Sequence, residues 1–194
     1  MKSYRFFALL AISLISLTAC EKFAQAQEIM KIKSGDASIF HEEISFNVVI
    51  NDADPIIDGK YQNAKDYYTS KSETEYSNFL RDLDRAHESF VTYYNEKKGV
   101  IKSSIDNTPE SLYTLTIDVT TMNVGNGGGF AYGLSKKSGG AVVYGTMIFT
   151  DNTSGNILCE FEFSGIKGLL SPKFNGRAIS VYRYLADAFI KTIQ

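Results

Sequence analysis

Histidines and cysteines are the residues best suited to nucleophilic or metal chemistry, and the 194-residue chain has only two of each. His41 and His87 belong to no ligand spacing such as His-x-x-x-His, so the sequence predicts no metal site. Asp84 precedes His87 by three residues, and we expect this pair to be a surface contact rather than a base and its orienting carboxylate. Cys159 lies in an alternating apolar pattern, so we expect a buried, unreactive thiol in a strand. If Cys20 carries a modification, Cys159 has no cysteine partner and no disulfide can form.

Acidic residues and glycines form two further motifs, and each lacks part of its pattern. Asp52, Asp54 and Asp58 suggest a calcium loop, but Ile56 occupies the third ligand position and the twelfth position is not a glutamate. Residues 123–129 are superficially similar to the glycine-rich cofactor loop of methyltransferases, but the residues that follow have no helical period. We therefore expect the aspartate motif to be a solvated loop and the glycine motif to be part of a glycine-rich hairpin, and we expect neither to bind a metal or a cofactor. A carboxylate pair for glycoside hydrolysis stays open, because its geometry is spatial.

The N-terminus carries the pattern of an export signal. Lys2 and Arg5 precede an apolar run of 12 residues, Phe6 to Leu17, which is shorter than the roughly 20 residues that a membrane-spanning helix needs. Leu17-Thr18-Ala19-Cys20 follows directly and resembles a bacterial lipobox. The resemblance implies that residues 1–19 are a signal peptide, that cleavage falls before Cys20, and that acyl chains on Cys20 anchor the protein to a membrane.

A second cleavage pattern competes with the first. Ala24-Gln25-Ala26 fits ordinary signal peptidase and would make Gln27 the N-terminus of a soluble secreted or periplasmic form. We expect the anchored form, with 20–36 as a polar tether and 37–194 as a single α+β domain in the bacterial cell envelope, facing the periplasm or the cell surface. The formal net charge is −2, and loss of the signal peptide with Lys2 and Arg5 makes it −4, so no basic stripe favours a nucleic-acid partner.

Apolar periodicity predicts the elements of the domain. Alternation predicts four strands, and the last two form a hairpin around a turn at 151–155: Phe40–Ile50, Tyr113–Val124, Ala141–Thr150 and Asn156–Phe163. Ser72 and Glu75 form a capping box ahead of a long amphipathic helix that Gly99 can end. A second helical pattern runs over 178–193. We predict an α+β fold, a mostly antiparallel sheet of about four strands with both helices on one face. Its expected core includes Phe79, Leu83, Phe90, Leu185 and Phe189.

One segment resembles a known group of proteins. From Thr146 to Gln194 the chain has a strand, the turn Asp151 to Asn156, a second strand and a closing helix with Leu185-Ala186. This quarter of the chain resembles the C-terminal half of bacterial envelope lipoprotein domains of the curli-secretion and Pel-polysaccharide lipoprotein group. Ser154-Gly155 replaces Thr-Gly at the turn, and the pore-forming segments of the curli protein have no evident counterpart. The resemblance implies an anticodon-binding-like two-layer sandwich that can form homo-oligomers, and it transfers no catalytic residue.

These patterns favour an exported lipoprotein that is not an enzyme. We expect an envelope interaction or assembly component whose partners are the membrane, through Cys20, and either an envelope protein or further copies of itself. Tyr67, Tyr68, Tyr132 and the segment 125–140 are the expected contact residues. The alternative is a secreted soluble hydrolase or a small-ligand-binding protein. It would require a deep pocket with at least two carboxylates or a Ser/His pair.

Overall fold

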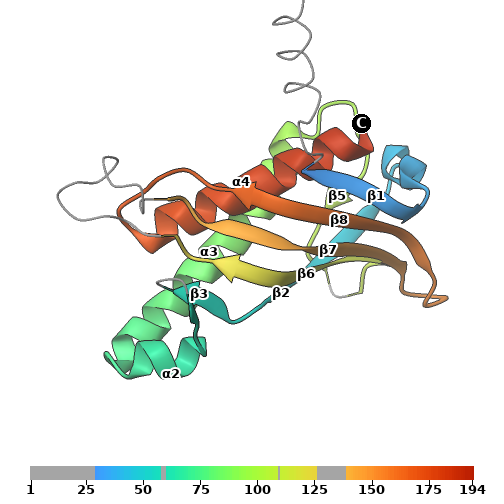
Figure 1. Cartoon of the computed structure of the whole chain (residues 1–194). Helices are drawn as coiled ribbons and strands as arrows, with labels where there is room; N and C mark the ends of the chain where they lie inside the picture. The colour runs from blue at the N-terminus through green and yellow to red at the C-terminus, as the bar shows by residue number, and fades with distance from the viewer. Residues whose placement is uncertain (1–28, 58–59, 109, 126–138) are drawn as a thin grey trace, which may run out of the picture.

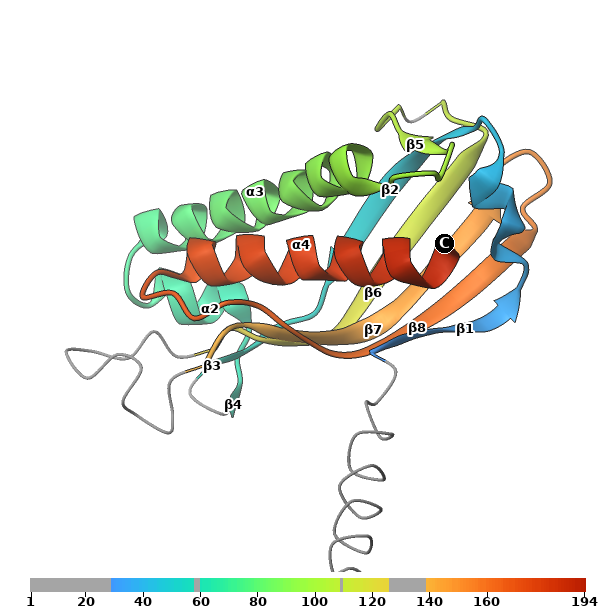
Figure 2. The same ribbon diagram turned by 90° about the horizontal axis from the view of Figure 1, so that it is seen from above.

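The computed structural model describes residues 29–57, 60–108, 110–125 and 139–194, which form two layers. A twisted sheet makes one layer, and the helices α3 (Glu73–Lys97) and α4 (Phe174–Ile193) lie side by side across one face of it (Figures 1 and 2). Cys20, Tyr132 and residues 126–138 of the glycine-rich segment lie outside the described residues. Two shorter helices, η1 (Ala37–His41) and α2 (Ala64–Thr69), complete the helical elements of the described chain.

The sheet has eight strands in the described residues, and its main path runs β1-β8-β7-β6-β2-β5. Beyond this path, β3 pairs with β6 and β4 pairs with β3. The strands are β1 (Met30–Gly35), β2 (Ser45–Asp52), β3 (Pro55–Ile57), β4 (Lys60–Tyr61), β5 (Ser104–Ile105), β6 (Tyr113–Asn123), β7 (Val142–Asp151) and β8 (Ile157–Lys167).

The prediction of a mostly antiparallel sheet of about four strands is wrong. The sheet is larger and mixed: β1, β8, β7 and β6 pair antiparallel, whereas β2 pairs parallel with β6 and with β5, and β3 pairs parallel with β6. Parallel neighbours need a long crossover connection, and α3 supplies it between β2 and β6. The strand–helix–strand order of residues 45–123 was therefore the signal for a parallel pair.

The first strand was not predicted at all. Residues 30–35, expected as part of the tether, form β1 and pair with β8 in the register Met30 to Phe163. Only Met30 in this strand is buried, because β1 is the outermost strand and its remaining side chains face solvent. An edge strand with one buried residue has too little apolar alternation to be read from its sequence.

The long helices and the core agree closely with the sequence patterns. The Ser72 side chain accepts a hydrogen bond from the Glu75 backbone N–H at the start of α3, which is the predicted cap. All five predicted core residues are buried: Phe79, Leu83, Phe90, Leu185 and Phe189. They belong to one hydrophobic core, in which Phe40 of η1 packs 4.5 Å from Phe149 of β7, measured between ring centroids. This core holds α3, α4 and the sheet in one fixed arrangement.

Candidate functional site

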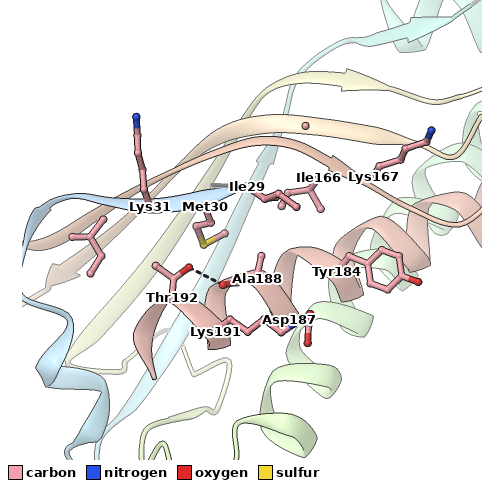
Figure 3. A pocket seen from close by; sticks show the side chains of 12 residues that line it. Ile29, Met30, Lys31, Ile166, Lys167, Tyr184, Asp187, Ala188, Lys191 and Thr192 are labelled. Atoms are coloured by element: carbon pink, nitrogen blue, oxygen red, sulfur yellow. Dashed lines mark hydrogen bonds and ion pairs between the residues drawn. The ribbon is translucent and has the colours of Figure 1, made fainter. Parts of the chain in front are cut away.

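A groove of about 890 Å³ lies between the outer strands of the sheet and the C-terminal half of α4 (Figure 3). One wall comes from Ile29–Ile32, at the start of β1, and from Gly165–Lys167 of β8. The opposite wall is formed by residues of α4 from Tyr184 to Thr192. The volume falls within the range of small-ligand sites, about 300–1,000 Å³. We call this feature the edge groove.

The groove exists because two neighbouring strands end at different points. The pairing of β1 with β8 starts at Met30 and Phe163, and Ser164 N–H donates to Ile29 C=O at 2.9 Å. β8 continues to Lys167, where only β7 pairs with it in the described part of the chain. Helix α4 therefore lies over a stretch of sheet edge with no outer strand, and apolar side chains stay accessible there. Ile29 is 51% exposed, Ile32 43% and Tyr184 40%.

The charges along the edge groove are mostly positive. Lys31 forms an ion pair with Glu162 at 3.1 Å, and Lys191 pairs with Asp187 at 2.7 Å. Lys167 is exposed and has no carboxylate within 4.0 Å in the described residues. Three lysines thus belong to the lining residues of the groove, and two of them are each paired with a carboxylate.

A second feature, which we call the closed cluster, joins β2, α3 and α4. Asp52 at the end of β2 accepts a hydrogen bond from the Tyr182 hydroxyl and lies 2.7 Å from His87 Nε2 through its other carboxylate oxygen. The His87 and Tyr182 rings meet edge to face with centroids 5.1 Å apart. Burial, and then the charge of Asp52, raise the pKa of Tyr182 well above its usual value. Tyr182 therefore keeps its proton and donates it to Asp52.

The closed cluster corrects the prediction for His87. The sequence suggested a surface contact with Asp84, but the partner of His87 in the structure is Asp52, 35 residues away along the chain. The contact depends on how α3 packs against β2, so no local spacing could have shown it. The signal available in the sequence was only that an aspartate ends an apolar strand.

A small depression of about 280 Å³ lies beside the closed cluster and contains three aspartates, Asp52, Asp54 and Asp84, with His87. Its remaining walls are apolar side chains and backbone, including Phe79, Leu80 and Leu83. Its polar side chains are these carboxylates and the imidazole, without a serine, threonine, cysteine, lysine or tyrosine. No group of three or more side chains that could hold a metal ion occurs in the residues that the structure describes. A carboxylate can act as a base or as a nucleophile, so the depression contains the residue type that glycoside hydrolysis uses.

The remaining residues singled out in the sequence, where the structure describes them, lie outside the edge groove and the closed cluster. Cys159 is fully buried in β8, and burial raises the pKa of its thiol to about 11, so the thiol stays protonated at neutral pH. Tyr67 and Tyr68 lie on α2, where Tyr68 stacks on Phe79 at 4.5 Å between centroids. His41 ends η1. Asp58 lies outside the described residues.

Sequence reasoning missed a buried arginine that fixes the base of the glycine-rich segment. Arg177 in α4 donates from Nε to Val124 C=O at 2.7 Å and from a terminal nitrogen to Ser171 C=O at 2.7 Å. Gly125 has a φ of 69°, and a Cβ there would lie 2.4 Å from the carbonyl oxygen of Gly139. The described ends of the segment therefore meet beside α4, and Gly125 is required by both its backbone conformation and this close approach.

Among solved structures, comparison finds PelC as one similar protein. No family model matches the chain, and no curated protein matches it. Two crystal forms of the PelC dodecamer from Paraburkholderia phytofirmans, one of them a point variant, are 13% identical to it. They cover 82% of this chain and 95–96% of their own, with TM-scores of 0.40 and 0.41. PelC belongs by name to the Pel-polysaccharide group that the C-terminal quarter of the sequence resembles. With TM-scores below 0.5, this likeness carries no argument about activity or assembly.

Proposed function

We propose that the protein is an exported bacterial lipoprotein, anchored through Cys20, that acts in the cell envelope by binding rather than by catalysis. The observation that carries this proposal is the position of the edge groove. Its lining begins with Ile29, the first described residue after the segment that starts at Cys20. The edge groove thus lies where the segment that starts at Cys20 joins the fold.

The length of that segment limits how far the groove can be from a membrane. Nine residues, from Cys20 to Glu28, precede Ile29. Fully extended, they span at most about 30 Å. Acyl chains on Cys20 would therefore keep the edge groove within about one domain diameter of the bilayer. No helix in the described residues is both long and apolar enough to cross a bilayer.

The closed cluster supports a role in binding because its polar groups already satisfy one another. A catalytic base must be free to take a proton from a substrate or water. Asp52 instead uses one oxygen for the buried Tyr182 hydroxyl and the other for His87. The depression beside it has no hydroxyl, thiol or amine nucleophile among its lining residues. We infer that this cluster fixes β2 against the two helices.

Metabolic labelling with a fatty-acid probe tests the proposal. The wild-type protein should be labelled and recovered with membranes, and its mature N-terminus should be Cys20. The Cys20→Ala variant should lose the label and leave the membrane fraction. A wild-type protein that stays unlabelled, or whose mature chain starts at Gln27, would contradict the lipoprotein proposal.

A second candidate function has its own observation in the three aspartates beside His87. A secreted hydrolase acting on peptidoglycan or another glycan would use two of these carboxylates, one as the acid and one as the base or nucleophile. Asp54→Asn and Asp84→Asn together leave the closed cluster intact and remove two of the three carboxylates. Turnover of a glycan by the wild-type protein that disappears in this variant would establish the second candidate and reject the first.

A further inference from the structure

We propose that the edge groove holds an anionic phospholipid of the bilayer to which Cys20 attaches the protein. The inference rests on the proposed function, because it takes the membrane to be the surface nearest the groove. It goes beyond that function by assigning the fold a lipid site of its own, separate from the acyl chains on Cys20.

The interior of the groove suits an acyl chain. Ile29, Met30 and Ile166 extend from the strands toward α4, and Ala188 faces them from the helix (Figure 3). Ile29 and Ile32 remain about half exposed at the open side, so the folded domain leaves apolar surface in water there. Burying that surface against hydrocarbon is favourable, in proportion to the area removed from water.

The rim of the groove suits a phosphate. Lys191 lies on α4 and Lys167 extends from the end of β8, whereas Lys31 extends from β1 away from α4, so the ammonium groups stand at the margins of the groove (Figure 3). The side chains of Lys31 and Lys191 are 54% and 70% exposed despite their ion pairs, and an exposed pair can exchange its partner for a phosphate at little cost. Basic groups near an anionic bilayer each strengthen binding about fivefold. A chain of net negative charge that places three lysines here is locally complementary to an anionic headgroup.

The geometry favours a lipid within the bilayer over an amphiphile taken from solution. The groove is open along the sheet edge rather than enclosed, because β1 does not cover Gly165–Lys167 of β8. An open groove leaves part of an acyl chain in water unless the bilayer itself covers it. The nine-residue connection to Cys20 keeps that bilayer within reach.

Vesicle co-sedimentation of the mature chain with Cys20→Ser tests the inference without the covalent lipid. The described fold lies within residues 29–194, so this form retains it. We expect binding to mixed phosphatidylcholine–phosphatidylglycerol vesicles and little binding to phosphatidylcholine alone. Ile29→Ser with Ile32→Ser should weaken binding roughly tenfold, and Lys167→Ala about fivefold. The matched control, Leu112→Ser with Ile157→Ser, changes two apolar residues that are somewhat more exposed than Ile29 and Ile32 and do not line the edge groove, and it should bind as the parent does.

Several results would overturn the inference. These are equal binding to both vesicle types, no binding, or groove variants that bind as tightly as the control once circular dichroism shows them folded. Saturable binding of a soluble fatty acid without vesicle binding would also overturn it, by replacing the bilayer as the source of the ligand. The protein in this assay carries Cys20→Ser and has no covalent lipid. Vesicle binding can therefore fail or succeed independently of the labelling experiment, which tests the anchor on Cys20.

Discussion

Two tyrosines within one turn of the same helix have opposite surroundings. Tyr182 is fully buried and donates its hydroxyl proton to Asp52 in the closed cluster. Tyr184, two residues later, is 40% exposed and lines the edge groove. Along α4, therefore, one face completes a polar network inside the fold and the opposite face leaves apolar surface accessible. Polar residues that satisfy one another inside a protein mostly specify its structure, whereas accessible apolar surface marks a place for a partner.

The comparison shows why chemically suggestive residues can be misleading. Asp52, His87 and Tyr182 include the residue types that act as acids and bases, yet their geometry joins three elements of the fold. The edge groove contains no unusual residue type, and it results from a difference in length between two strands. Substitutions around the closed cluster should therefore change stability, whereas substitutions at the edge groove should change binding.

The largest loss of stability should come from removing a buried apolar side chain next to the closed cluster. Leu83→Ala removes a buried side chain of α3 next to the closed cluster and should lower the free energy of unfolding by about 2–5 kcal/mol. Leu80→Ala changes a residue on the same helix that is 42% exposed and should stay within about 0.5 kcal/mol of wild type. Urea denaturation measures both. Equal effects of the two substitutions would mean that α3 does not bury the face that carries Leu83.

The polar network should contribute a smaller amount. Tyr182→Phe leaves Asp52 without one of its two hydrogen-bond partners and should cost about 1.5–3 kcal/mol in the same measurement. Tyr184→Phe removes a hydroxyl from an exposed ring and serves as the matched control. If Tyr182→Phe proved as stable as that control, the network would not hold β2 against the helices.

Alkaline pH should destabilise the fold through its buried tyrosines. Burial raises the pKa of Tyr68 and of Tyr94 to about 12, and it also raises the pKa of Tyr182 well above its usual value. Above about pH 10 the unfolded chain releases these protons while the folded chain keeps them, so the unfolded state binds fewer protons. The contribution of these tyrosines to stability should therefore be constant below about pH 10 and fall as pH rises toward about 12, by at most about 1.4 kcal/mol per pH unit for each tyrosine. Thermal melts of wild type and Tyr94→Phe check this, since the variant should show a shallower decline, and a stability independent of pH in this range would contradict it.

The smallest effect on stability should come from the groove itself. Lys31→Ala breaks an exposed ion pair with Glu162 and should change the free energy of unfolding by about 0.5 kcal/mol or less. Chemical denaturation of the variant at low and at high salt checks this. A loss of more than about 1 kcal/mol in the free energy of unfolding would show that the groove rim supports the fold.

The elements that depend on local patterns were predictable, and those that depend on tertiary context were not. The Ser72 cap and the apolar spacing of α3 are local, and they placed that helix to within a residue of its observed start. The edge strand β1, with one buried residue, and the two- and three-residue strands β3, β4 and β5 have too few residues to produce a period. The pairing of Asp52 with His87 and the edge groove both arise when distant elements pack, so neither has a signature in the sequence.

Vesicle binding by two tyrosine variants of the mature Cys20→Ser chain tests most directly whether the groove, rather than the closed cluster, acts in binding. Tyr184→Glu places a negative charge at the groove and should weaken binding to phosphatidylglycerol-containing vesicles at least fivefold, with no change in melting temperature. Tyr182→Phe should lower the melting temperature and bind vesicles as the parent does at temperatures where it is folded. If Tyr184→Glu binds unchanged while Tyr182→Phe loses binding in its folded state, the assignment of function to the edge groove is wrong.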